Sequence, residues 1–195
     1  MKFQQVYYVL DTEFRLLWVG GEWDEFALAN SGPKARSCEV LSSSLLSHIA
    51  DETTQDVMIR LVRAVTSAHE PLRIDYRCDS YTMLRRFQMT IQPMKENRVL
   101  VVHDLRDART FERPHLPWQH DASALDTKCS FCNSVRLNGA IVWTAPEDLE
   151  AEHPAKVAYS ICESCDARVT EAISALNDRR KPHGTVAGGF GPEKD

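Results

Sequence analysis

The sequence predicts an α+β fold: a five-stranded antiparallel sheet with inserted helices, followed by a small four-cysteine module with a terminal helix. The first observation behind this prediction is the order of the patterns, because two strand-like segments precede one long helical region and three strand-like segments follow it. The second is a group of four cysteines in the last third of the 195-residue chain, arranged as two Cys-x-x-Cys pairs.

The first two strands are predicted to form a hairpin. Residues 3–10 are rich in β-branched and aromatic side chains and end at Asp11-Thr12, which is a turn signal. Residues 16–19 form the second apolar run, which Gly20-Gly21 ends. A short helix is predicted for residues 22–30.

A longer helical region connects this hairpin to the next strand. Leu41, Leu45 and Ile49 have the spacing of a short helix, and Asp51 is a suitable cap for the helix that follows. Apolar side chains then recur at helical spacing and predict a buried stripe, made of Val57, Met58, Leu61, Val62 and Val65.

Three further strands are predicted from residues 72–78, 86–91 and 99–102. The first two alternate apolar with polar side chains, as expected when one face of a sheet is buried and the other is solvated. The third is a continuous apolar run, which favours a central position in the sheet. Residues 95–97 are polar and predict the tight turn before it.

Composition and charge limit the classes of function. The net charge is −5 and neither half of the chain is basic, which argues against a protein that binds nucleic acid mainly through phosphates. The N-terminal segment lacks the features of a signal peptide, and no apolar run approaches the roughly 18 residues of a membrane span. We therefore predict a cytoplasmic protein with reduced thiols, no nucleic-acid partner and no membrane association.

The pairs Cys129–Cys132 and Cys162–Cys165 are the strongest functional signal. A two-residue spacing turns both thiolates of a pair toward one point, and four thiolates suit a tetrahedral structural zinc site. The 29 residues between the pairs exceed the spacing of a compact zinc ribbon. A longer loop costs only about 0.6 kcal/mol per doubling of its length. The sequence therefore predicts a zinc-ribbon-like module, with residues 141–143 as a strand and residues 167–180 as a helix.

Alternatives remain open for these cysteines. One Cys-x-x-Cys pair at a helix start can exchange disulfides, but this chain has two pairs and lacks the strand–helix–strand pattern of thioredoxin-like proteins. Sensing of oxidants through release of the zinc is a second alternative. A third is that His153, which lies between the pairs, replaces one of the thiolate ligands.

Several short segments within residues 3–107 carry a family resemblance. They include Asp11 with the strand at residues 15–19, the segment Glu22-Trp23-Asp24-Glu25-Phe26-Ala27, and Ile49-Ala50-Asp51 at the start of the long helix. Together they resemble the PAS sensor domains. The resemblance implies a module whose sheet face or cavity responds to a signal and passes it to a signalling partner or within a homodimer.

Other segments resemble one subgroup within the PAS family. Tyr76-Arg77-Cys78-Asp79-Ser80 and the double arginine Arg85-Arg86 are similar to a subgroup of bacterial PAS proteins. Members of that subgroup commonly carry a downstream Cys-Ser-Trp-Cys and an Ile-Cys-x-x-Cys. This chain has Cys129-Ser130-Phe131-Cys132, with Phe in place of Trp, and Ile161-Cys162-Glu163-Ser164-Cys165.

These patterns divide the chain into four parts. Residues 1–107 are predicted to be the PAS-like sensor domain, residues 108–126 a linker, residues 127–181 the zinc-binding module and residues 182–195 a disordered tail. The linker contains prolines and has little periodicity, and the tail is rich in glycine.

A cavity is one interpretation of the inward-facing positions of the PAS-like domain. Seven large side chains at these positions either fill the core or line a small-molecule site: Tyr8, Trp18, Phe26, Met58, Tyr76, Phe87 and Met89. Haem is not expected, because His48, its helical candidate ligand, is more simply a surface or capping residue. Flavin is not expected either, because Cys38 does not lie in the Asn-Cys-Arg-Phe-Leu-Gln segment of PAS-type photosensors.

Four other side chains have simple structural interpretations. Arg85 and Arg86 are adjacent on a strand, so we expect them to point to opposite faces and to pair with carboxylates such as Asp75 or Asp79. The more specific alternative is that the two arginines bind an anion. The two remaining cysteines are predicted to be small, part-buried core residues: Cys38 and Cys78.

The predicted function is sensing and signalling through protein–protein contact, without catalysis and with a structural zinc. The main alternative is a redox- or metal-responsive regulator in which the four-cysteine site is the sensor. An enzyme would need a titratable group in the PAS cavity, for which His48 is the candidate. A zinc-ribbon DNA-binding protein would need basic charge that this chain lacks.

Overall fold

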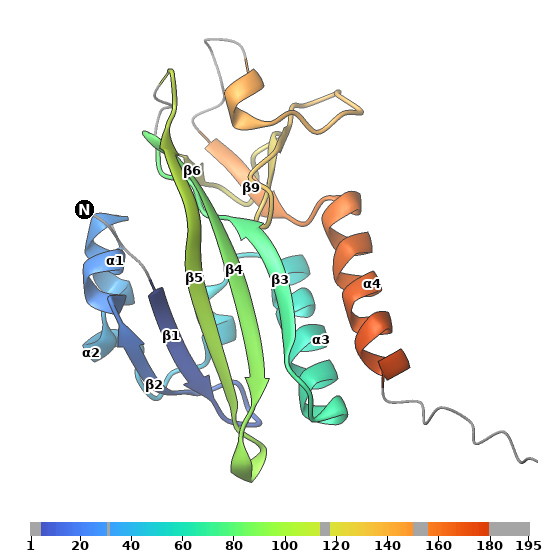
Figure 1. Cartoon of the computed structure of the whole chain (residues 1–195). Coiled ribbons are helices and arrows are strands. Elements are labelled where there is room, and N and C mark those ends of the chain that lie inside the picture. Colours follow the sequence, from blue (N-terminus) through green and yellow to red (C-terminus); the bar gives the residue numbers. More distant parts are fainter. Residues whose placement is uncertain (1–4, 31, 114–117, 150–155, 180–195) are drawn as a thin grey trace, which may run out of the picture.

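The computed structural model describes residues 5–30, 32–113, 118–149 and 156–179. Its main feature is a five-stranded antiparallel sheet in the order β2-β1-β5-β4-β3, which is shown with its helices in Figure 1. The strands are β1 (Gln5–Leu10), β2 (Leu16–Gly21), β3 (Leu72–Arg77), β4 (Met83–Pro93) and β5 (Val99–Thr110). The α+β class and the predicted strand order along the chain are therefore confirmed.

The helices of this part lie between β2 and β3 in the sequence, as predicted. They are α1 (Trp23–Ala29), η1 (Pro33–Ala35), α2 (Ser37–Val40), η2 (Leu45–His48) and α3 (Glu52–Ala68). The single short helix expected around Leu41, Leu45 and Ile49 is wrong, because α2 ends at Val40 and a separate 3-10 turn follows. A five-stranded antiparallel sheet with its helices inserted at this point is a PAS-like architecture.

One face of the sheet packs against α3 and forms the core. Leu10, Leu61, Val65, Ile91 and Val101 are fully buried there. The alternation predicted for the strands places these side chains on one face, and α3 presents its apolar stripe to them. We call the opposite face, which carries mostly polar side chains on β3 and β4, the outer face.

The start of α3 is fixed by a side-chain cap. The Asp51 Oδ1 atom accepts a hydrogen bond from the Thr54 backbone N–H at 2.8 Å and another from the Thr53 hydroxyl at 2.6 Å. The cap satisfies one of the N–H groups that a helix leaves unpaired at its first turn. The helix ends at Ala68, and the next residue, His69, has a φ of 57° in the left-handed region.

We expect Asp51→Ala to lower the free energy of unfolding by about 1–2 kcal/mol, because the Thr54 N–H loses its acceptor. Urea denaturation measures this loss. Asp51→Asn should lose less, since its amide oxygen can accept the same bond. The control is Asp56→Ala on the exposed side of α3, which removes only a surface ion pair with Arg60 and should cost about 0.5 kcal/mol or less. An equal loss in Asp51→Ala and Asp56→Ala would contradict the cap.

Strands β4 and β5 are longer than the patterns predict. They are joined by the tight turn η3 (Lys95–Asn97) and pair from Pro93–Val99 to Met83–Thr110, with an irregularity between Arg86 and Phe87. Strand β5 therefore continues past residue 107, where the sensor domain was expected to end. This extension carries the sheet up to the C-terminal part of the chain (Figure 1).

The C-terminal part contains a second, smaller sheet and a long helix. The sheet has the order β6-β9-β7-β8, and its strands are β6 (Gln119–His120), β7 (Thr127–Cys129), β8 (Val135–Arg136) and β9 (Lys156–Ser160). The turn η4 (Pro146–Asp148) precedes β9, and α4 (Glu163–Arg179) follows it. Strand β6 lies within the predicted linker. No helix of the described residues is both long and apolar enough to cross a membrane.

Two predictions for this part need comment. The expected strand at residues 141–143 is wrong, because this segment forms bends and Ile141 is 93% exposed. The expected terminal helix is confirmed, but it begins at Glu163 rather than at residue 167, so that Cys165 lies inside its first turn. The predicted tail at residues 182–195 lies outside the described residues.

The C-terminal part packs against the edge of the sheet. Helix α4 lies beside α3 and the edge strand β3 (Figure 1), and its buried residues Val169 and Leu176 belong to the same apolar cluster as the sheet core. The Phe131 carbonyl accepts a hydrogen bond from the Arg77 N–H at 2.7 Å, and Arg168 donates to the Asp75 carbonyl at 2.7 Å. Backbone groups at the outer edge of β3 are thereby paired, which removes a template for strand addition.

Candidate metal centre

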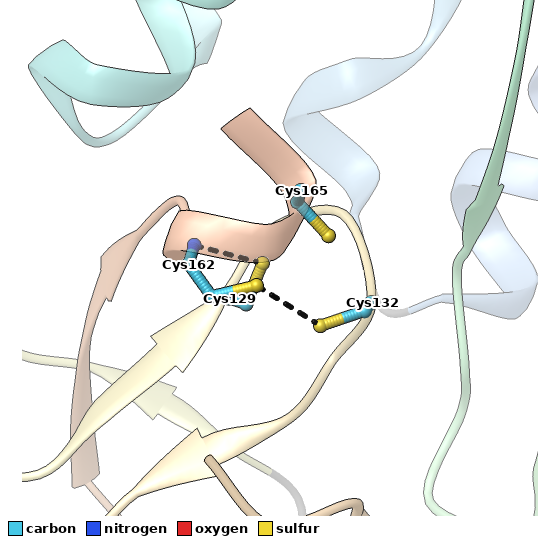
Figure 2. A group of neighbouring side chains, drawn as sticks. All are labelled: Cys129, Cys132, Cys162 and Cys165. Carbon is cyan, nitrogen blue, oxygen red and sulfur yellow. Dashed lines mark hydrogen bonds between the residues drawn. The ribbon is translucent and has the colours of Figure 1, made fainter. Parts of the chain in front are cut away.

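The four cysteines of the two Cys-x-x-Cys pairs converge on one point, as Figure 2 shows. Cys129 ends β7, Cys132 lies in the following turn, Cys162 precedes α4 and Cys165 lies in its first turn. Their sulfur atoms all lie within 4.8 Å of one another, and Cys132 Sγ and Cys162 Sγ are 3.7 Å apart. Four sulfurs at about 2.3 Å from a tetrahedral zinc ion are about 3.8 Å from one another. The geometry therefore fits the ion predicted from the spacing.

A tight backbone turn places the first pair of sulfurs. The Cys129 N–H donates to the Ser134 carbonyl at 2.8 Å, and the Asn133 N–H donates to the Cys129 carbonyl at 3.0 Å. Asn133 has a φ of 63°, a left-handed conformation that asparagine tolerates better than most residues. Its side-chain oxygen also accepts a hydrogen bond from the buried Lys128 ammonium. We call this turn, residues 129–134, the knuckle.

Backbone N–H groups and hydroxyls surround the sulfur atoms. Cys129 Sγ accepts hydrogen bonds from the N–H groups of Phe131 at 3.4 Å and Cys162 at 3.3 Å. The Ser164 hydroxyl lies 3.2 Å from Cys162 Sγ. Such donors stabilise thiolate charge and hold the ligands in position around a metal. The first turn of α4 adds unpaired N–H groups, which also favour negative sulfur.

Close packing of the sulfurs separates the pKa values of their thiols. Hydrogen bonds from Cys129 and Cys165 stabilise the Cys132 thiolate and hold the pKa of that thiol well below its usual range. The contact with Cys132 raises the pKa of Cys129 to about 11, and the contacts with Cys129 and Cys132 raise the pKa of Cys165 as well. Without a cation, one thiolate thus disfavours ionisation of its neighbours. A divalent ion removes this penalty, because all four sulfurs then bind as thiolates.

The donor set fits a closed structural site. Within the described residues, no histidine or carboxylate joins the four sulfur atoms of this group. Three of the cysteines are buried and Cys132 is half-buried, so that little room is left for a substrate at a metal bound there. A catalytic zinc keeps an open position, whereas four thiolates fill the coordination sphere. His153, the alternative ligand, lies outside the described residues.

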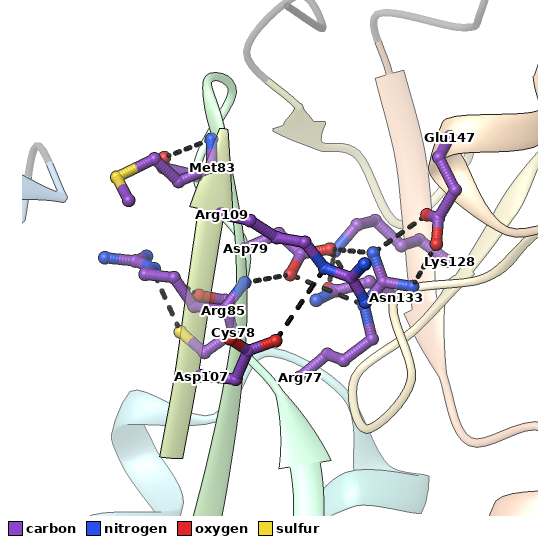
Figure 3. A network of polar contacts seen from close by, with 11 residues as sticks. Arg77, Cys78, Asp79, Met83, Arg85, Asp107, Arg109, Lys128, Asn133 and Glu147 are labelled. Atoms are coloured by element: carbon purple, nitrogen blue, oxygen red, sulfur yellow. Dashed lines mark hydrogen bonds and ion pairs between the residues drawn. The ribbon is translucent and has the colours of Figure 1, made fainter. Parts of the chain in front are cut away.

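The knuckle is fastened to the sheet by packing and by ion pairs. The buried Phe131 ring lies 6.2 Å from the Tyr76 ring, measured between centroids. At the end of β3, Arg77 forms ion pairs with Asp79 at 2.6 Å and with Glu147 of the C-terminal part at 2.9 Å, as seen in Figure 3. These contacts join the metal centre to the edge of the PAS-like sheet. These contacts join segments that are about 70 residues apart, so no local sequence pattern predicted them.

Most of the seven predicted cavity residues lie in the core. Tyr8, Met58 and Met89 are buried in the cluster between the sheet and α3, and Tyr76 packs against its edge. Phe87 is buried as well, with Phe26 at 5.9 Å and Tyr76 at 5.6 Å between ring centroids. These contacts are those of a packed core.

Trp18 is the exception, because its side chain is 61% exposed. Leu16 and Trp18 should point the same way on a regular strand, and Leu16 is fully buried. The β1–β2 register, however, shifts between Val9 and Leu10, so that Leu10 pairs with Leu16 while Val9 pairs with Trp18. The extra residue, Leu17, reverses the alternation. Trp18 therefore points to the outer face, and its assignment to a cavity is wrong.

Sequence patterns did not indicate a part-buried polar cluster at the core face of the sheet. The Tyr76 hydroxyl is 2.8 Å from His103 Nδ1, and the Tyr8 ring lies 5.5 Å from the His103 ring. Burial lowers the pKa of His103 to about 4 and raises those of Tyr8 and Tyr76. His103 has the same parity on β5 as Val99 and Val101, which was the available signal that it faces the core.

We expect His103 to make the fold sensitive to acid. Its pKa is near 6.5 in the unfolded chain and about 4 in the folded one, so only the unfolded state gains a proton in between. Its stabilising contribution is complete above pH 6.5 and is lost as the pH falls to about 4. We expect a loss of about 2 kcal/mol, less than the full shift implies because the side chain is only partly buried.

Urea denaturation of the wild type and of His103→Gln at a series of pH values isolates this contribution. Acid also protonates the cysteines in both proteins, so the difference between the two is the relevant quantity. The wild type should lose more stability than the variant between pH 6.5 and 4. Equal pH dependence in the two proteins would contradict the assignment.

The structure corrects the predictions for Cys38 and Arg85 and agrees with those for Cys78 and His48. Cys38 is exposed rather than part-buried, whereas Cys78 is part-buried as predicted. The buried Arg85 guanidinium lies over the Phe26 ring and donates to the Cys78 carbonyl and to Asn30 Oδ1, each at 2.6 Å, instead of pairing with a carboxylate. His48 is exposed, at 2.6 Å from the Ser43 hydroxyl.

Comparisons with known proteins leave the function open. No family model matches the chain, and a search of curated proteins finds no relative. Among solved structures, the chain is similar to an RNA-binding light-oxygen-voltage receptor, with 16% sequence identity and a TM-score of 0.35. The similarity covers 52% of this chain and 28% of the receptor chain. At this TM-score it decides nothing about this chain, and the PAS-like description rests on the arrangement of the sheet and helices.

Proposed function

We propose that this chain is a cytoplasmic, non-catalytic PAS-type sensory module that acts through protein–protein contact and binds one structural zinc ion. The observation that carries the proposal is the convergence of four thiol groups within 4.8 Å beside the edge strand of a PAS-like sheet. A structural ion at this point holds two segments that are 29 residues apart in the sequence. It thereby fixes the knuckle and α4 against the sheet.

The contacts of the knuckle suggest a route for a signal. Phe131 packs on Tyr76, which in turn contacts His103 in the core. A change in packing at the core face of the sheet would therefore alter the positions of the knuckle and α4. The proposal assigns recognition to the PAS-like sheet, output to a surface that a partner or a second copy binds, and a stabilising role to the zinc.

Elemental analysis of the purified protein, combined with an absorbance scan, tests the metal and the cofactor together. We expect one zinc ion per chain and no visible absorbance band. Zinc that is absent, or that dissociates on gel filtration without loss of structure, would contradict a structural site. A haem or flavin spectrum would contradict the expectation that the core is filled by side chains.

A second candidate function is favoured by the exposure of one ligand. Cys132 is half-buried while the other three cysteines are buried, so an oxidant reaches one thiolate of the site more readily. Hydrogen peroxide takes two electrons from two thiolates, which join in a disulfide and release the zinc, and the peroxide with two protons becomes two water molecules. Cys132 and Cys162, with sulfurs 3.7 Å apart, are suited to this step.

A chromogenic zinc indicator follows this release during titration with hydrogen peroxide. A redox regulator should release zinc at low oxidant and recover it after addition of a thiol reductant. If the zinc stays bound until the protein denatures, the redox function is contradicted and only the structural role of the zinc remains.

A further inference from the structure

A cleft of about 540 Å³ lies beside the metal centre, at the end of the sheet where β3, β4 and β5 meet the knuckle and α4. Its lining includes four arginines and two aspartates: Arg77, Arg86, Arg106, Arg168, Asp75 and Asp107. The formal charge of these six side chains is positive, although the whole chain has a net charge of −5. Asp79 and Glu147 pair with Arg77, and Asp104 lies 3.6 Å from Arg106, so the uncompensated positive charge comes from Arg86 and Arg168. A positive cleft on an acidic protein selects for an anionic ligand that is small or locally acidic.

Two of these guanidinium groups lack a carboxylate partner. Arg86 is exposed on β4 and forms no ion pair within the described part of the chain. Arg168 donates to the carbonyl oxygen of Asp75, which is a neutral acceptor. Asp107, which lies opposite Arg86 in the strand register, pairs instead with Arg109 at 3.7 Å. Arg86 and Arg168 therefore keep positive charge that a ligand can use.

The positions of the other two arginines are fixed by hydrogen bonds. Arg106 donates to Gln88 Oε1 at 2.7 Å, and the Gln88 amide donates to Asp75 Oδ1 at 3.0 Å, so that one row of polar side chains crosses three strands. In the next row, Arg77 stands directly opposite Arg86. Like charges in directly opposite positions destabilise a sheet. Asp79 and Glu147 offset the charge of Arg77 in this pair, so Arg86 is the arginine whose charge a bound carboxylate can neutralise.

The cleft is completed by the metal centre. Phe131 and Cys132 of the knuckle line it, and Arg168 enters it from α4. The three strands alone would provide only part of its wall. A metal ion that holds the knuckle and α4 in place therefore also shapes this cleft.

We propose that the cleft binds a carboxylate-rich segment of a partner protein. This inference rests on the proposed function and names the chemistry of the partner. The planar guanidinium group donates two parallel hydrogen bonds to a carboxylate, which makes arginine the suitable residue for this ligand. A nucleic acid is less well matched, because Asp75, Asp107 and the overall negative charge repel an extended row of phosphates.

The test uses the full zinc-loaded chain and fluorescence anisotropy with a short fluorescein-labelled peptide rich in glutamate. The matched peptide carries glutamine in place of each glutamate. We expect the glutamate peptide alone to bind, and Arg86→Gln to weaken that binding by about tenfold, because one charge-assisted hydrogen bond is lost. Arg73→Gln is the control, since Arg73 is an exposed arginine on the neighbouring edge strand β3 and does not line the cleft. It should change the affinity by less than about twofold.

The outcomes separate this inference from the proposed function. Zinc content and the unfolding transition are measured for every variant, so that a lost metal site is recognised independently of peptide binding. No peptide binding below about 1 mM in a protein that retains its zinc overturns the cleft assignment alone. Equal binding of the glutamine peptide also overturns it. A labelled single-stranded RNA that binds more tightly than the peptide, and that loses affinity in Arg86→Gln, overturns it in favour of nucleic acid.

Discussion

Cys162→Ser is expected to remove the zinc from the chain and to unfold the segment that the metal holds. Cys162 is buried, its sulfur lies 3.7 Å from that of Cys132, and its N–H donates to Cys129 Sγ. A hydroxyl is a poor substitute for a thiolate ligand of zinc. Apparent binding free energies of structural zinc sites are about 10–16 kcal/mol at neutral pH, and this energy contributes to folding. The variant should therefore lose most of the stability of the knuckle and of α4.

The loss should be confined to one part of the molecule. Leu61, Ile91 and Val101, which are fully buried between the sheet and α3, do not depend on the metal for their contacts. Hydrogen exchange measured by mass spectrometry should therefore show lost protection in residues 127–149 and 156–179 and retained protection in β1, β4 and β5. The midpoint of thermal unfolding of the remaining sheet should also fall, because α4 no longer covers α3 and the edge of β3.

Cys38→Ser is the matched control for this experiment. Cys38 is an exposed cysteine that lies outside the group of four, so its replacement should leave the zinc content and the exchange pattern unchanged. Removal of zinc from the wild type by a chelator should reproduce the effect of Cys162→Ser. If Cys162→Ser keeps its zinc and its resistance to protease, the four-thiolate site is refuted.

The sequence contained enough information for the elements and for the grouping of the four cysteines. Period-two alternation located β3 and β4, and helical spacing with an Asp51 cap located α3, because both patterns reflect burial of one face. The cysteines were found for a different reason, since a two-residue spacing restricts the ligand geometry within each pair. These signals are local, so they can be recognised in the sequence without knowledge of the tertiary structure.

The features that sequence reasoning missed depend on contacts between distant segments. The orientation of Trp18 depends on one extra residue in the pairing of β1 with β2, which the alternation in β2 alone does not show. The contact between Phe131 and Tyr76 joins residues from two predicted domains. The arginine-lined cleft, likewise, is made by three strands, the knuckle and α4 together. No periodic pattern reports such contacts.

Phe131 has the second largest expected effect, because it connects the metal centre to the sheet. Its ring is 5% exposed and contacts Tyr76, while its carbonyl pairs with the Arg77 N–H at the edge of β3. Phe131→Ala leaves all four thiolates in place but removes the ring from the core. We expect the free energy of unfolding of the zinc-loaded protein to fall by about 4 kcal/mol, as for other buried phenylalanines.

A double-mutant cycle with Tyr76→Ala separates the ring contact from general loss of packing. Paired aromatic rings contribute about 0.5–1.5 kcal/mol beyond the area they bury, so the two losses should add to more than the loss in the double variant by that amount. Ile141→Ala is the control, because Ile141 is a large apolar residue in the same part of the chain that is 93% exposed. It should cost less than about 0.5 kcal/mol. Full additivity of the Phe131 and Tyr76 losses would mean that the knuckle and the sheet are not coupled through these rings, and the proposed route from the core to the metal centre would then have to run elsewhere.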